Sequence, residues 1–145
     1  MDERQIEEFI AGYLRSRLPD MEVERFATDA MDVLMRAKQI GFGLVEVSHA
    51  DTVAGYEVID EFGVYEIESE FAVTILVNDQ GRGKDDLYDV FLKARDYLAK
   101  MEIDGCVVRI VRHQIHPQKF PDMVEGVYIA EIVVNVKRVY NGFAE

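Results

Sequence analysis

Apolar and polar residues alternate from Phe62 to Val77, the longest such pattern in the chain. An alternation with a period of two is typical of a strand that buries one face. Glu66, Glu68 and Glu70 occupy polar positions in the first half, whereas both faces of the second half are mostly apolar. We predict a strand about three times the usual length. Its second half should be central in a sheet, and its first half should bend or project as an arm.

The pattern after this strand changes first to that of a turn and then to that of a helix. Residues 78–83 (NDQGRG) include types that tolerate positive φ and favour a turn. Apolar residues then recur at helical spacing, at Leu87, Val90, Phe91, Ala94, Leu98 and Met101. This spacing predicts an amphipathic helix that lies on the sheet, with Asp85 or Asp86 as its N-cap.

Two further helices are predicted in the first third of the chain. An apolar stripe from Ile6 to Leu14 predicts a helix over residues 3–17, which Pro19 stops. A second helix is predicted from Thr28 or Asp29 to about residue 38.

The remaining segments are predicted as strands and connections. We predict strands at Met21–Phe26 (a short edge strand), Leu44–Val47, Cys106–Ile115 and Val127–Val139. The pattern loosens from His49 to Glu61, where we expect a loop or an irregular hairpin tip, in which Tyr56, Val58 and Ile59 could form a short strand. Two prolines favour an exposed connection over residues 116–123.

The predicted order of elements is therefore α-β-α-β-β-α-β-β. This order favours an α+β fold in which helices pack on a mostly antiparallel sheet with a projecting long strand or hairpin. A chain of 145 residues, 49% of them apolar, is long enough for one domain with its own core. We expect residues 1–145 to form that single domain.

The charge of the chain limits its partners. The formal net charge is −12, and residues 1–70 contain 17 acidic and 6 basic residues against 11 and 10 in residues 71–145. Such a chain repels phosphate backbones, so sequence-specific nucleic-acid binding is not expected. We find no signal-peptide pattern and no apolar run that could cross a membrane, and we expect a soluble protein made in a reducing cytoplasm. Its one cysteine, Cys106, is expected to be buried and unreactive.

None of the candidate chemical sites fits its chemistry well. His113 and His116 lie near Asp122, but strand residues three apart point to opposite faces, and zinc needs three or four convergent ligands. Residues 81–84 (GRGK) lack the spacing and the hydroxyl of a phosphate loop. Acidic residues at 85, 86 and 89 are explained by the dipole of a first helical turn. We therefore predict no catalytic, cofactor-binding or metal-binding residues and no enzymatic activity.

The most distinctive polar feature is the row formed by Glu66, Glu68 and Glu70 on one strand face. One interpretation is a solvated edge that resists unwanted strand pairing. The other is a negative surface to which passing DNA does not adhere.

The succession of elements resembles the tail terminator proteins of long-tailed phages. The segments that carry the resemblance are the helix Ile6–Leu14, the strand Gly43–Val47, the long strand Glu70–Val77, the helix Asp86–Leu92, and the closing strands Val107–Ile115 and Tyr128–Val136. The pattern is most similar to the terminator of Mu-like phages and is similar to the gpU type of lambda. The resemblance covers about residues 4–140.

The resemblance implies a homo-hexameric ring on the last ring of the tail tube, at the head-proximal end of the virion tail. Such a ring stops tube growth, offers a surface to the neck or head-completion protein, and lets DNA pass through its lumen. It needs no cofactor, and it is assembled in the host cytoplasm.

We accordingly expect subunits to meet at the exposed edge of the arm or of the last strand, because strand edges invite pairing. Glu66, Glu68 and Glu70 should face the lumen or a partner. The subunit interface should include Phe62 and Val64 of the arm and Phe120 and Met123 of the connection. The alternatives are a neck or head-completion adaptor of the same particle and, in a different class, a small cytosolic α+β ligand-binding protein or enzyme.

Overall fold

The computed structural model describes residues 1–25, 37, 43–58, 64–115 and 126–141. Its helices are α1 (Glu3–Arg17) and α3 (Lys84–Lys100), and its strands are β1 (Glu22–Arg25), β2 (Gly43–Val58), β3 (Val64–Asn78), β4 (Cys106–Ile115) and β5 (Val127–Asn141). Of the predicted second helix only Ala37 is described; it is helical and buried. The rest of that helix lies outside the described residues.

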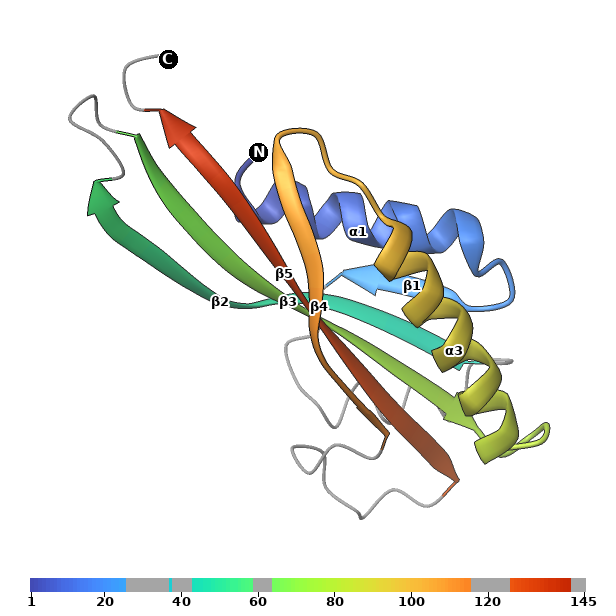
Figure 1. Ribbon diagram of the computed structural model, residues 1–145. Helices are drawn as coiled ribbons and strands as arrows, with labels where there is room; N and C mark the ends of the chain where they lie inside the picture. The colour runs from blue at the N-terminus through green and yellow to red at the C-terminus, as the bar shows by residue number, and fades with distance from the viewer. Residues whose placement is uncertain (26–36, 38–42, 59–63, 116–125, 142–145) are drawn as a thin grey trace.

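The five strands form one mixed sheet in the order β1-β2-β3-β5-β4 (Figure 1). Only β1 and β2 are parallel; the other three pairs are antiparallel. The predicted α+β fold with a mostly antiparallel sheet is confirmed. β1 is an edge strand, as predicted for Met21–Phe26.

Both helices pack on one face of the sheet and share one hydrophobic core with it. α1 begins with a capping box, in which the Asp2 carboxylate accepts a hydrogen bond from the Gln5 amide. α1 and α3 also touch, because the Tyr13 hydroxyl donates to the Tyr97 carbonyl at 2.6 Å. The core side chains are those of Ile6, Ile10, Leu14, Phe71, Ile75, Leu87, Leu98 and Ile132, all of them at most 1% exposed.

The second half of β3 is buried on both faces, as its pattern predicted. Phe71 and Ile75 contribute to the core under the helices, whereas Ala72 and Leu76, on the opposite face, are also buried. This half is central in the sheet, because it is paired with β2 on one side and with β5 on the other.

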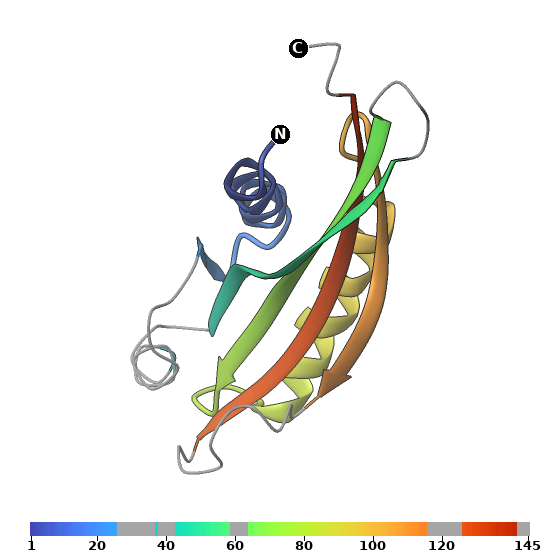
Figure 2. The same ribbon diagram turned by 90° about the vertical axis from the view of Figure 1, so that its left-hand side faces the viewer.

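The first half of β3 extends beyond both helices, together with β2 and β5 (Figures 1 and 2). We call this region the three-stranded arm; it comprises Ser48–Val58, Val64–Glu70 and Asn135–Asn141. The predicted projection is confirmed. However, the prediction that the first half of β3 has an exposed edge is wrong, because it is paired on both sides as far as Tyr65.

Of the two alternatives predicted for His49–Glu61, the loop is wrong for the described residues, which agree with an irregular hairpin. β2 continues to Val58 opposite β3, with irregularities between His49 and Asp51 and between Gly55 and Val58. Ala50 is an extra residue at the first irregularity, and it shifts the alternation by one position. Apart from these irregularities, pairing with β3 supplies the hydrogen-bond partners that keep this segment extended.

The turn before α3 also differs from the prediction. The N-cap is Gly83, with φ of 60°, a conformation that glycine adopts without strain, and not Asp85 or Asp86. The Asp86 carboxylate instead accepts hydrogen bonds from the amide and the Nε of Arg82, at 2.8 and 3.1 Å. This contact closes the turn, so Asp86 stabilises the loop that leads into the helix.

Candidate functional site

Glu66, Glu68 and Glu70 lie on the sheet face opposite the helices, since they alternate with residues that point toward the helix side. The same face carries Lys137 of β5 and Arg112 of β4. Lys137 Nζ is 3.0 Å from the Glu66 carboxylate, and Arg112 is 3.8 Å from that of Glu70. We call this surface the charged face. It is mixed in sign, because two of the three glutamates lie within ion-pair distance of a base.

The interpretation of the three glutamates as a solvated edge is wrong, because β3 is the middle strand of the sheet. The last strand is not an edge either over most of its length, since β4 pairs with Ala130–Arg138 of β5. The placement of the charged face toward a lumen or a partner remains a prediction.

Among the described strands, the open edges of the sheet belong to β1, to β4 and to the part of β2 that extends beyond β1. β4 pairs only with β5 among the described strands. On β2, β1 pairs with Leu44–Val47, and Glu7 Oε2 accepts the amide of His49 at 2.8 Å. Beyond these contacts, the described part of the chain offers no strand to the outer side of Asp51–Val58. We call this segment the free edge of β2.

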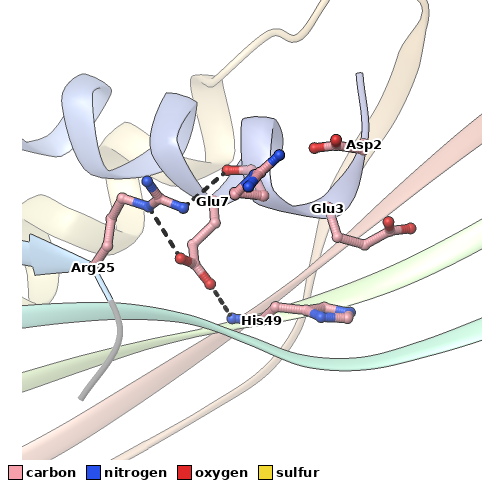
Figure 3. Close-up of a pocket in the computed structure, with 6 residues that line it drawn as sticks. Asp2, Glu3, Glu7, Arg25 and His49 are labelled. Atoms are coloured by element: carbon pink, nitrogen blue, oxygen red, sulfur yellow. Dashed lines mark hydrogen bonds and ion pairs between the residues drawn. The ribbon is translucent and has the colours of Figure 1, made fainter. Parts of the chain in front are cut away.

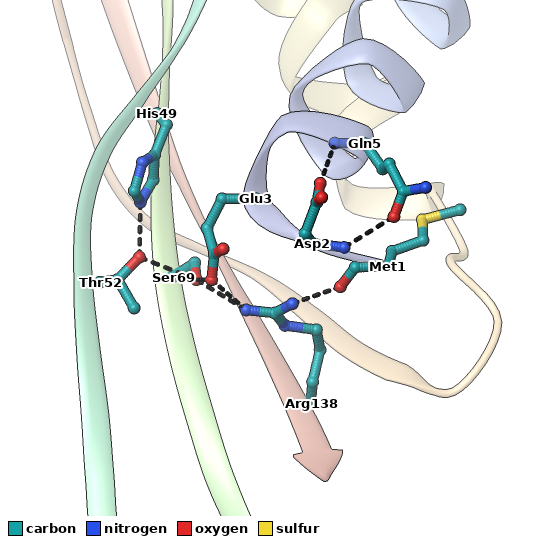
Figure 4. Close-up of polar contacts among 8 residues, drawn as sticks. All are labelled: Met1, Asp2, Glu3, Gln5, His49, Thr52, Ser69 and Arg138. Atoms are coloured by element: carbon teal, nitrogen blue, oxygen red, sulfur yellow. Dashed lines mark hydrogen bonds and ion pairs between the residues drawn. The ribbon is translucent and has the colours of Figure 1, made fainter. Parts of the chain in front are cut away.

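On the helix face, a chain of polar contacts marks the boundary between the core and the three-stranded arm (Figure 4). His49 Nε2 lies 2.6 Å from Thr52 Oγ1, which lies 3.2 Å from Ser69 Oγ. Ser69 donates to the Glu3 carboxylate at 3.2 Å, and Arg138 donates to Glu3 and to the Met1 carbonyl. We call this chain the polar row. It joins the start of α1 to β2, β3 and β5.

The polar row changes the acidity of Glu3. Burial opposes ionisation of its carboxyl group, but hydrogen bonds from its own amide and from Arg138, with the charge of Arg138, outweigh that effect. The net result is a pKa below the ordinary value of 4.5. Glu3 therefore serves as an ionised structural partner of Arg138.

Sequence analysis missed the polar row, although two signals for it exist. Arg138 continues the spacing of Ile132, Val134 and Val136, so it is a charged residue at an apolar-face position. Ser69 is likewise two residues from Phe71 on the same strand, so it points to the same face of the sheet as Phe71. A polar residue on the buried face of a strand calls for a hydrogen-bond partner. That partner, Glu3, is more than a hundred residues away from Arg138 in sequence.

A hollow of about 750 Å³ opens beside the polar row, between α1 and β2 (Figure 3). It is lined by Asp2, Glu3, Arg4, Glu7, Arg25 and His49. The Glu7 carboxylate already accepts Arg25 Nε at 3.0 Å and the His49 amide at 2.8 Å. Glu3 and Glu7, two of the carboxylates that line the hollow, therefore both hold structural contacts.

The other chemical candidates also have structural roles. His113 packs its ring against Phe91 on the helix face, with ring centroids 5.8 Å apart. Burial raises the pKa of the part-buried Cys106 thiol, which lowers its reactivity at neutral pH. Within the described ranges, no three His, Cys, Asp or Glu side chains come together as metal ligands.

Of the residues predicted for the interface, Val64 belongs to the part of the chain that the structure describes. Phe62, Phe120 and Met123 lie outside the described residues, as do His116 and Asp122 of the rejected metal site. Val64 is the first residue of β3 and pairs with Asn141 at the tip of the three-stranded arm. None of the helices in the described ranges is long and apolar enough to cross a membrane.

Comparison with known proteins gives a likeness of fold. No protein-family model and no curated protein matches the chain. Among solved structures, it is similar to the sheath/tube terminator of an extracellular contractile injection system (PVC) in the extended state, with a TM-score of 0.58 and 14% sequence identity. The match covers 97% of this chain and 57% of that chain, so this chain spans little more than half of the terminator's length. The likeness is one of fold, and it extends over nearly all of this chain.

Proposed function

We propose that this protein is a tail terminator, which binds the end of a tail tube and stops its polymerisation. The observation that carries the proposal is the fold, which matches that of a sheath/tube terminator over 97% of this chain. The order of elements in the sequence supports the same role independently, through the resemblance to phage tail terminators.

The proposed working form is a homo-hexameric ring at the head-proximal end of a phage tail or a related contractile particle, assembled in the host cytoplasm. The ring would contact the tube on one side and a neck or head-completion protein on the other. A net charge of −12 per subunit suits a channel through which DNA passes without adhering.

The proposed role is structural and needs no catalysis. Glu3, Glu7 and Asp86 are each held by an arginine, and the Cys106 thiol is disfavoured as a thiolate. These contacts explain the polar residues as stabilising groups of the fold.

The test is growth of tail tubes from purified tube protein of the same particle, with and without this chain. We expect shorter tubes, with the labelled protein at one end only and in ring-shaped density. An unrelated acidic protein of similar size serves as the control. Tubes that keep the same length distribution and bind none of the protein would contradict the proposal; binding only to purified neck or connector complexes would favour the adaptor alternative.

A further inference from the structure

The edge formed by β4 and the free edge of β2 carry opposite charge. β4 contains Arg109 and Arg112 and no acidic residue. β2 from Ser48 to Val58 contains Asp51 and Glu57 and no Lys or Arg. The arginines of β4 are conspicuous in a chain whose net charge is −12.

These charges lie at opposite ends of one cross-strand row. Register partners link Asp51 to Glu70, Glu70 to Asn135 and Asn135 to Arg109, so Asp51 and Arg109 are on the same face, the charged face. The neighbouring row on this face runs from position 53 through Glu68 and Lys137 to Val107. The first row therefore ends in opposite charges, Asp51 at the β2 edge and Arg109 at the β4 edge.

The β4 edge also exposes apolar surface. In the described part of the chain the exposed large apolar side chains are those of Met1, Tyr88, Leu92, Val107 and Val111, and all except Met1 belong to α3 or β4. Val107 is 64% exposed at a strand edge for which the described ranges provide no further strand. Exposed apolar residues beside unpaired backbone groups favour addition of another strand.

We infer that β4 of one copy pairs with the free edge of β2 of the next copy, with Arg109 beside Asp51. This inference rests on the proposed ring and specifies its subunit contact. Each of the three pairs that link β2 to β4 through β3 and β5 is antiparallel, so β2 and β4 run in opposite directions. If neighbouring copies are related by rotation about an axis that runs along the strands, the strands of both copies keep the same directions. The pair of β4 from one copy and β2 from the next is therefore antiparallel as well.

Charge selects this head-to-tail contact over symmetric ones. Pairing of β4 with a second β4 would bring Arg109 and Arg112 against the same arginines, and pairing of two β2 edges would oppose Asp51 to Asp51. Like charges across a strand pair are destabilising. A heterologous contact of this kind generates a ring when its rotation closes. Closing a sheet into a ring also requires a register shift between neighbouring strands. A shift of two positions between β2 and β4 leaves Asp51 on the same face and brings it toward Arg112.

Edge charges have another use, since they can keep a monomer from pairing with any strand. The two roles predict opposite results for charge reversal. If the charges only prevent pairing, reversing one of them leaves the association state unchanged. If they join copies, reversal weakens assembly, and a compensating reversal on the partner restores it.

The experiment compares Asp51→Arg, Arg109→Glu and their equimolar mixture with the wild-type protein, by native mass spectrometry over a concentration series. We expect each variant alone to need at least a tenfold higher concentration to assemble. The mixture should recover wild-type assembly, because every contact between alternating copies of the two variants again joins one base to one acid. The double variant Arg109→Glu with Arg112→Glu should lose assembly more completely, since it removes both bases that Asp51 can reach.

Lys93→Glu is the matched control, since it reverses an exposed charge on the α1 side of α3, away from β4. It should assemble like the wild-type protein. Thermal melting of each variant checks that it is folded.

Three outcomes overturn the edge contact: variants that assemble like the wild-type protein, a mixture that does not recover, or a wild-type protein that stays monomeric throughout the series. The tube-capping assay separates this result from the proposed function. Wild-type protein that caps tubes, together with edge variants that assemble normally, removes the edge contact and leaves the terminator role intact.

Discussion

At the scale of single residues, the contact between Glu3 and Arg138 makes stability depend on pH. The folded-state pKa of Glu3 is below its ordinary value of 4.5, so the contribution of this group is complete above that value. It is lost as the pH falls through the folded-state pKa. We expect Glu3→Gln to lower the free energy of unfolding by about 1 kcal/mol at pH 7, since solvent screens the part-exposed carboxylate. Urea unfolding at pH 7 and near pH 3.5 measures this, and the difference from the wild-type protein should shrink at the lower pH.

Glu102→Gln provides the control for Glu3→Gln. Glu102 is exposed, and its removal should change the free energy of unfolding by less than about 0.5 kcal/mol at either pH. An equal loss in both variants, or a loss in Glu3→Gln that does not depend on pH, would rule out the polar row as its cause.

At the scale of elements, two glycines should respond to alanine in opposite ways. Gly12 lies inside α1, and an added Cβ would meet no atom within 4 Å. Gly12→Ala should stabilise the protein by about 1 kcal/mol, because alanine is the better helix former. At Gly83, φ is +60° and an added Cβ would lie 3.0 Å from the Tyr128 ring. Gly83→Ala should cost about 1–2 kcal/mol. Thermal unfolding of both variants tests this, and the same direction of shift in both would contradict the backbone assignment.

The three-stranded arm allows a second test at this scale. The amides of Glu66–Glu70 belong to a strand that is paired on both sides, whereas β4 is paired on one side in the described part of the sheet. In dilute protein, amide hydrogen exchange should therefore be slower in this part of β3 than in β4. The amides of an edge strand are exposed to solvent by local openings that cost less free energy. Exchange at Glu66–Glu70 that is as fast as in β4 would indicate that the three-stranded arm does not form in solution.

The elements differ in how far their sequences predict them. β3 was predictable because its burial follows the alternation, with Phe71 and Ile75 at positions that the helices cover. β2 beyond His49 was not, because Ala50 interrupts its period and its hydrogen-bond partners come from another segment. The alternation along the strand is enough to predict that Glu66, Glu68 and Glu70 lie on one face of the sheet. That their strand is central depends on strand order, which residues far away in the chain determine.

At the scale of the whole molecule, the net charge of −12 predicts that the wild-type protein does not bind duplex DNA at physiological salt. Fluorescence anisotropy with a labelled duplex measures this, for the monomer and for any assembled ring. Micromolar affinity that falls steeply with added salt would contradict the prediction.

The position of the charged face in the ring decides the effect of reversing Glu66, Glu68 and Glu70 together to lysine. Each reversal raises the net charge of the subunit by two units. The reversals at 66 and 70 also remove carboxylates that lie beside Lys137 and Arg112. If the charged face lines the channel, the assembled variant should gain salt-sensitive DNA binding and still cap tubes. If the face contacts a partner protein, capping or neck binding should be lost without DNA binding in the ring. A variant that caps tubes and binds its partners normally, and binds no DNA, would place the three glutamates on the outer wall.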